Sequence, residues 1–267
     1  MAATGLIKLI GDQYWFLLPI LFSLLPIWNT YRFIRVPLKK TLTIEEKTPL
    51  RELFSSKIFI VALIVMICSG ACEMAMTQWS SYFAEKGLQV SKFTGDLLGP
   101  CLLALSMGLG RTVYGLWGQK INIKSALTVS SVVSCICFLI TALAPHPVLS
   151  LAGCAFSGLA TGIMWPGTLT LASTRFRFGG GSMFSVLAIF GDIGCSLGSW
   201  LVGKISALAM QSSALANIGT HFHLNAEQAA LRFGMLTMAA FPIIMFVCLR
   251  FFSIHSAKPH NTQTETV

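Results

Sequence analysis

The sequence has 267 residues, of which 54% are hydrophobic and only 11% are charged. A soluble domain carries about 25% charged residues, so the composition excludes an ordinary soluble protein. The charges also cluster between long apolar runs, which excludes a disordered chain, a coiled coil and a disulfide scaffold. A spanning helix and its loop take roughly 30–35 residues, so an integral membrane protein with about seven spans is predicted.

Seven apolar segments reach the roughly 20 residues that a helix needs to cross a bilayer. The runs are continuous, whereas the strands of a membrane barrel alternate, so the fold class is an all-α integral membrane protein. The predicted transmembrane helices are 14–33, 58–84, 96–117, 125–144, 149–173, 182–208 and 231–252.

The positive charges predict the orientation of these spans in the lipid bilayer. Thirteen of the 19 Lys and Arg residues fall on one side, chiefly between the first two spans. Because cytoplasmic loops carry the excess of Lys and Arg, the 32–57 segment and the C-terminus are predicted to be cytoplasmic and the N-terminus outside. This is a multi-pass protein of the cell membrane in that interpretation. The sequence contains no basic patch with interleaved aromatic residues, which is the pattern that would indicate nucleic-acid binding.

No cofactor, metal site or enzymatic site is predicted. All eight cysteines lie inside apolar runs, where they are interpreted as small packing residues. The polar outer loop 209–230 contains His221, His223 and Glu227, which could bind a metal, but a solvated loop is the favoured interpretation. The sequence shows no nucleophile–base pair, metal quartet or phosphate cradle, so an enzyme is not expected.

An acidic residue and its polar neighbours mark the second span. Ser69, Glu73, Thr77 and Ser80 fall on one helical face. An ionisable group inside a span is costly unless it faces water or the bundle interior, so it is a candidate functional residue. Such a stripe either lines an aqueous cavity, the preferred interpretation, or hydrogen-bonds a neighbouring helix.

The sixth span carries a second acidic residue, Asp192, which shares a face with Ser185, Ser196 and Ser199. Asp192 is interpreted either as part of an ion pair, with Arg111 of the third span or with another span, or as a residue on a solute path. A protonated Asp192 is a further possibility, because a buried unpaired carboxyl group would be neutral.

The fifth span has a polar face and a proline at its middle. Thr161, Trp165 and Thr168 share a face, and Pro166 is expected to break or kink the helix. Interrupted helices near the midplane are where secondary transporters build binding sites, so Thr161 and Trp165 join the candidates. The alternative is a kink that serves packing alone.

Three stretches resemble the C-terminal half of the major facilitator superfamily. Gly70-x-x-Glu73, followed by Trp79 and Tyr82, resembles the seventh helix of the fucose/glucose–proton symporter branch. Residues 110–124 resemble the loop between helices eight and nine, and residues 158–181 resemble helices ten and eleven. In the second stretch, Gln119, Asn122 and Ile123 replace the aspartate, glycine and arginine of the superfamily signature.

The resemblance implies a domain organisation of one helix plus a six-helix half-bundle. An N-terminal segment with one transmembrane helix, similar to helix six, occupies 1–35, and a basic cytoplasmic linker occupies 36–57. The six-helix bundle, similar to helices seven to twelve, occupies 58–254, and a disordered cytoplasmic tail occupies 255–267. Helices one to five of such a transporter are expected to be absent from this chain, so the missing N-terminal half or a second copy is an expected partner.

The resemblance also implies a secondary transporter of a small polar solute, a sugar in the first instance, that works by alternating access with proton coupling. Two groups of residues carry this expectation. The substrate-cavity candidates are Glu73, Thr77, Gln78, Trp79, Thr161, Trp165, Asp192 and Ser196. The inner-gate candidates are Arg111, Gln119, Lys120 and Lys124. The alternatives are a non-transporting, receptor-like seven-helix protein and an inactive truncated product.

Overall fold

A computed structural model describes residues 11–37 and 48–252, and every element in these ranges is helical. The chain divides into two compact units, 1–46 and 47–267. The helices are η1 (Asp12–Tyr14), α2 (Leu17–Ile34), α3 (Leu50–Ser55), α4 (Lys57–Tyr82), η3 (Phe83–Gly87), α5 (Lys92–Asp96), η4 (Leu97–Cys101), α6 (Leu102–Trp117), η5 (Gly118–Lys120), α7 (Ile123–Leu143), α8 (Pro147–Arg175), α9 (Gly180–Met210), α10 (Ser213–His221), α11 (Ala226–Thr237) and α12 (Ala240–Phe251).

The prediction of an all-α membrane protein is confirmed. Seven helical segments of the described chain are long and apolar enough to cross a bilayer, and they match the seven predicted spans to within a few residues at most ends. The first unit contributes one of these segments, α2, which contains Pro26. A membrane helix tolerates such a proline, because neighbouring groups can satisfy the freed carbonyl.

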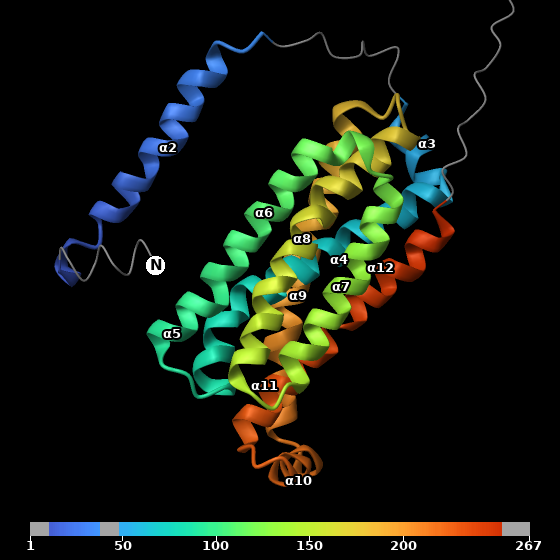
Figure 1. Cartoon of the computed structure of the whole chain (residues 1–267). Coiled ribbons are helices and arrows are strands. Elements are labelled where there is room, and N and C mark those ends of the chain that lie inside the picture. Colours follow the sequence, from blue (N-terminus) through green and yellow to red (C-terminus); the bar gives the residue numbers. More distant parts are fainter. Residues whose placement is uncertain (1–10, 38–47, 253–267) are drawn as a thin grey trace, which may run out of the picture. The chain divides into compact units, whose positions relative to one another are not determined.

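The second unit is a bundle whose long helices run side by side (Figure 1). Glycine seams allow two pairs of helices to approach closely. A Cβ at Gly198 of α9 would lie only 2.5 Å from the carbonyl oxygen of Ala71 in α4. In the same way, a Cβ at Gly162 of α8 would lie 2.7 Å from the carbonyl oxygen of Met107 in α6. Small residues drive helix association in membranes by permitting such contact, so α4–α9 and α6–α8 form the framework of the unit.

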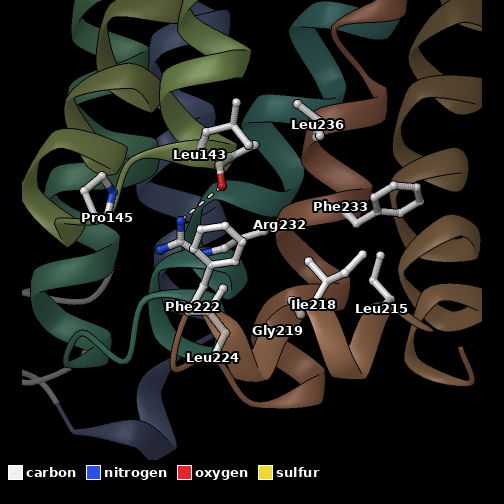
Figure 2. Close-up of a pocket in the computed structure, with 12 residues that line it drawn as sticks. Leu143, Pro145, Leu215, Ile218, Gly219, Phe222, Leu224, Arg232, Phe233 and Leu236 are labelled. Atoms are coloured by element: carbon white, nitrogen blue, oxygen red, sulfur yellow. Dashed lines mark hydrogen bonds between the residues drawn. The ribbon is translucent and has the colours of Figure 1, made fainter. Parts of the chain in front are cut away.

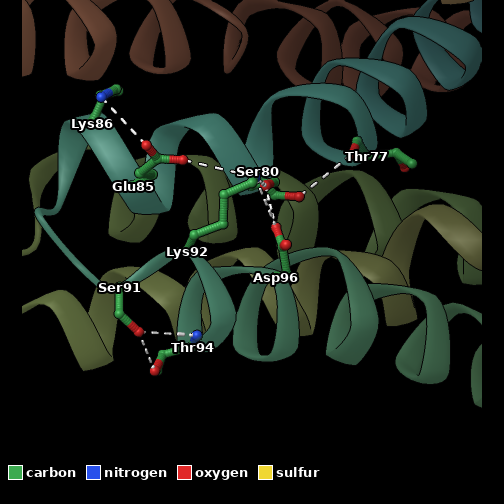
Figure 3. Close-up of polar contacts among 9 residues, drawn as sticks. Thr77, Ser80, Glu85, Lys86, Ser91, Lys92, Thr94 and Asp96 are labelled. Carbon is green, nitrogen blue, oxygen red and sulfur yellow. Dashed lines mark hydrogen bonds and ion pairs between the residues drawn. The ribbon is translucent and has the colours of Figure 1, made fainter. Parts of the chain in front are cut away.

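Two spans contain π-helical turns at one end of the bundle. η3 continues α4, and η4, with Pro100, continues α5 into α6. A cluster of charged side chains joins these two spans there (Figure 3). Lys92 lies 3.7 Å from Glu85 and 3.5 Å from Asp96, while Lys86 lies 3.3 Å from Glu85. These contacts stabilise the turn between the second and third spans.

Two local expectations change in the structure. Of the two effects expected of Pro166, a break or a kink, the break does not occur, since α8 continues from Pro147 to Arg175. A proline removes one backbone donor, and a packed membrane helix can tolerate this loss. The segment 209–230 is not a simple solvated loop, because it contains α10, which Ser212 caps by accepting from the N–H of Leu215 at 3.4 Å. Asn225 and Gln228 then form a capping box that begins α11.

The predicted linker, 36–57, is only partly described. Residues 48–57 contain α3, whose Leu53 is buried. Residues 38–47 and the predicted disordered tail, 255–267, lie outside the described residues. The division of the chain into four segments therefore stays a prediction.

Candidate functional site

An ion pair joins two neighbouring spans of the bundle. Nη2 of Arg111 in α6 donates to Oε1 of Glu73 in α4 across 3.0 Å. The side chain of Glu73 is 18% exposed, whereas that of Arg111 is 49% exposed. The second carboxylate oxygen, Oε2 of Glu73, is buried without a hydrogen-bond partner in the described chain. Oε2 can therefore accept a further hydrogen bond from a ligand or bind a proton.

Glu73 and Arg111 both line a cavity of about 480 Å³. Four helices supply its lining, which combines a carboxylate, a guanidinium group, a phenol, an indole and a thiol. The lining residues are Glu73, Arg111, Tyr114, Trp165, Pro166 and Cys195. The indole of Trp165 packs against Gly191 of α9, where any side chain would collide with the ring. Glycine at this position therefore sets where the aromatic wall lies.

A second cavity of about 650 Å³ lies between α4, α9 and α11. Nε1 of Trp79 donates to the backbone oxygen of Ser199 at 2.9 Å, and the Ser199 hydroxyl contacts Oε1 of Gln78 at 3.4 Å. The Trp79 ring meets Tyr82 edge to face, with 5.9 Å between centroids. Gln78 and Trp79 thus line a cavity, but a different one from that of Glu73 and Trp165.

Two of the candidate threonines bond to their own helices. The Thr77 hydroxyl donates to the backbone oxygen of Glu73 at 2.7 Å. Thr161 is buried and donates to the backbone oxygen of Ser157 at 3.1 Å. Neither lines the two cavities above. A hydroxyl that bonds back to its own helix needs no solute to satisfy it.

Asp192 and Ser196 are exposed on α9. The ion pair considered between Asp192 and Arg111 does not form, because Arg111 pairs with Glu73. Within the described ranges no hydrogen bond or ion pair involves the carboxylate of Asp192. Its exposure means that its charge is not buried within the second unit.

The inner-gate candidates do not form one cluster. Arg111 lies in the cavity with Glu73, while Nζ of Lys124 donates to the backbone oxygen of Phe252 at 2.6 Å. Lys124 thereby caps the end of the last span, as cations near helix C-termini do. Gln119 and Lys120 belong to η5; Lys120 is exposed, and the side chain of Gln119 lies outside the description.

The sequence reasoning missed two cavity residues, Tyr114 and Cys195. Tyr114 lies three positions after Arg111, and Cys195 lies three positions after Asp192. Both lie one helical turn from an ionisable residue that the sequence had already singled out, and this spacing could have identified them.

Among residues 11–37 and 48–252, no group of three His, Cys, Asp or Glu side chains could hold a metal ion. Glu227 of the considered histidine site instead accepts from the Tyr82 hydroxyl at 3.0 Å.

A family model of the Major Facilitator Superfamily matches residues 1–199. This match covers most of the chain, so the chain belongs to the Major Facilitator Superfamily. It has the helical, multi-pass membrane fold of that superfamily.

One similar solved structure is the inward-facing, unoccupied form of a bacterial homologue of the human lysosomal transporter Spinster. The two share 16% sequence identity at a TM-score of 0.59, and the match covers 84% of this chain and 54% of that chain. This likeness concerns the fold, and the chain spans about half the length of that homologue. No curated protein matches the chain.

Proposed function

We propose that this chain contributes to a secondary transporter that moves a small polar solute by alternating access, with Glu73 and Arg111 at the centre of the solute site. The observation that carries the proposal is their ion pair, which lies in a cavity lined from four helices. Ionisable residues inside spans mark substrate or ion pathways, because their cost in a bilayer is high. Membership of a superfamily of transporters supports the same function.

The chemistry of the cavity favours a sugar-like solute. Glu73, Arg111 and Tyr114 offer hydrogen-bond acceptors and donors, and Trp165 offers an aromatic face. A few polar groups beside aromatic side chains are typical of sites that orient a small polar ligand. The resemblance of Gly70-x-x-Glu73 and the following aromatics to the fucose/glucose–proton symporter branch points to the same class of solute.

Proton coupling would use the same carboxylate. In the described state Glu73 accepts from Arg111 with one oxygen, while its other oxygen has no partner. A solute that binds Arg111 would weaken this pair and favour protonation of Glu73. Loss of the proton from Glu73 would restore the ion pair with Arg111 and release the solute. Proton movement and solute movement would thereby be coupled.

Three exposed polar residues of the bundle suggest that another protein segment or water covers them. Gln78, Asp192 and Ser196 are exposed, although they are polar residues of membrane-spanning helices. Polar groups at this depth need a protein or water-filled surrounding. The other wall of the cavity would come from a second six-helix half, either in the same polypeptide or in a second copy of this chain.

Protection of Cys195 tests the solute site directly. The full chain in liposomes is treated with a membrane-permeant maleimide, with and without each member of a panel of hexoses, and modified peptides are quantified by mass spectrometry. A bound solute should slow the labelling of Cys195, which lines the cavity, several-fold. Cys101 is a matched control, since it is also partly exposed and lies outside this cavity.

The Glu73→Gln variant should lose this protection, while Asp96→Asn, a change of an acidic residue outside the cavity, should keep it. A panel in which no sugar slows the labelling of Cys195 would contradict the sugar assignment. Equal slowing of Cys195 and Cys101 would contradict a solute site in this cavity. For coupling, we expect an inward pH gradient to drive solute accumulation only when the complete cavity is present.

A further inference from the structure

A third cavity, of about 470 Å³, lies away from the Glu73–Arg111 site, between the end of α7 and the helices α10 and α11 (Figure 2). Arg232 is the only lining residue whose side chain is polar. The lining residues are Ala142, Leu143, Pro145, Leu215, Ile218, Gly219, Phe222, Leu224, Ala229, Arg232, Phe233 and Leu236. A space of this size and apolar character is typical of small-molecule sites.

Arg232 is held by the end of α7. Its Nη1 donates to the backbone oxygens of Ala142 at 3.0 Å and Ala144 at 2.8 Å. These bonds fix the guanidinium group at the cavity wall but do not neutralise it. Its Nε is buried without a partner, and in the described part of the chain no carboxylate forms an ion pair with it. The site therefore retains an uncompensated positive charge with free donors.

The position of Arg232 along the helices places this charge near a membrane edge. Ala144 follows the last residue of a membrane-spanning helix, and Arg232 bonds to it directly. Long Arg side chains near the ends of spanning helices extend to the interface, where they meet lipid headgroups. Phe233 and Leu236 of the cavity lie on the same span as Arg232, on α11. The cavity thus combines a cation near the edge of the membrane with apolar walls.

Exposed apolar side chains surround the same cavity. Ile218 is 54% exposed and Phe222 is 71% exposed, and both belong to the short segment that forms α10 and its end. Apolar surface next to a fixed cation matches an amphipathic ligand. The hydrocarbon chain of such a ligand covers the apolar surface, and its anionic group pairs with the cation. A free phosphate ion would leave these apolar walls uncovered.

We propose that this cavity is a specific site for one phospholipid with an anionic headgroup, such as phosphatidylglycerol. The lipid phosphate accepts hydrogen bonds from the guanidinium group of Arg232. One acyl chain lies against Ile218, Phe222 and Phe233. Arginine pairs with phosphate groups through charge-assisted hydrogen bonds of this kind. Bound lipid would hold α10 against the ends of α7 and α11.

Lipid retention tests the headgroup contact. The full chain is purified in mild detergent, mixed with equal amounts of phosphatidylglycerol and phosphatidylcholine, and analysed by native mass spectrometry. We expect one retained phosphatidylglycerol per chain and a several-fold loss in Arg232→Gln. Arg232→Lys should keep most of the binding, because it keeps the charge. Lys204→Gln removes an exposed cation outside the cavity and should bind like the unchanged protein.

A second pair of variants tests the acyl-chain contact without touching the cation. Ile218→Gln places a polar group on the exposed wall of the cavity and should weaken lipid retention several-fold. Leu208→Gln makes the same kind of change at a similarly exposed position on α9, outside the cavity, and should have no effect. Both residues are more than half exposed, so neither variant removes core packing.

Three outcomes would overturn the proposal. The first is equal retention of phosphatidylcholine and phosphatidylglycerol, which would indicate unspecific lipid around the bundle. The second is unchanged retention in both Arg232→Gln and Ile218→Gln. The third is complete displacement of the lipid by millimolar inorganic phosphate, which would indicate an anion site without a chain contact. None of these outcomes bears on the solute site.

Discussion

Arg111 of α6 and Glu73 of α4 are each other's ion-pair partners, with 3.0 Å between Nη2 and Oε1. The pair is asymmetric in its exposure to solvent. The arginine side chain is half exposed, whereas less than a fifth of the glutamate side chain is exposed. A charge that is largely buried depends on its partner more than a charge that is solvated. The two residues should therefore respond differently to substitution.

Arg111→Gln is expected to destabilise the bundle by about 1–3 kcal/mol, because it leaves the largely buried carboxylate without a charged partner. Glu73→Gln should cost less, since the exposed guanidinium group remains solvated. Thermal unfolding in detergent, followed by tryptophan fluorescence, measures both changes. The reverse order of stabilities would show that Arg111, not Glu73, is the member that needs its partner.

Gly198→Ala is expected to destabilise the second unit by about 1–3 kcal/mol, the usual cost of overpacking. The new methyl group would lie 2.5 Å from the carbonyl oxygen of Ala71, so α4 and α9 would have to separate. Gly108→Ala is the matched control, because nothing lies within 4 Å of its Cβ position. Equal unfolding temperatures for the two variants would refute a tight seam between α4 and α9.

Lys124→Ala is expected to destabilise the chain by about 1 kcal/mol, the net value of one hydrogen bond. The ammonium group of Lys124 bonds to the backbone oxygen of Phe252 at 2.6 Å, which connects the start of α7 to the end of α12. Lys120→Ala serves as control, since Lys120 is exposed and forms no described contact. A gating role for both lysines would instead predict normal stability and a shared defect in solute movement.

Asp192→Asn is expected to leave the unfolding temperature unchanged, because the exposed carboxylate forms no bond within the described residues. It should nevertheless weaken the solute protection of Cys195, which lies three positions further along the same helix and lines the cavity. Ser185→Ala, on the same face of α9, controls for loss of a polar group. Protection equal to that of the unchanged protein would remove Asp192 from the solute path.

The fold class was predictable from the sequence because membrane helices are local features. A run of about 20 apolar residues must form its hydrogen bonds within one helix, so length and composition alone identify each span. Gly194 and Gly198 are likewise four positions apart, the spacing typical of a seam for close packing, and the structure places them against Ile67 and Ala71. By contrast, α10 was missed, since its nine residues are too few to form a membrane-spanning run.

The site was only partly predictable, because its partners are distant in the sequence. The cost of ionisable groups in a bilayer identified Glu73, Arg111 and Asp192 as candidates, but it could not decide which of them pair. Thr161 and Lys124 have the residue types of a solute path and a gate, yet their hydroxyl and ammonium groups bond to backbone oxygens instead. Such choices depend on helix rotation and packing, which periodicity does not encode.

The sequence by itself therefore determined that the chain belongs in a membrane, where its helices lie and which residues are too costly there to be incidental. Only the tertiary structure decided that Glu73 meets Arg111, that Gln78 and Trp165 line separate cavities, and that Arg232 lies beside an apolar one. The physical reason is one of range. Hydrophobicity and hydrogen bonding act within each span, whereas ion pairs and cavities require side chains that helix packing brings together across the bundle.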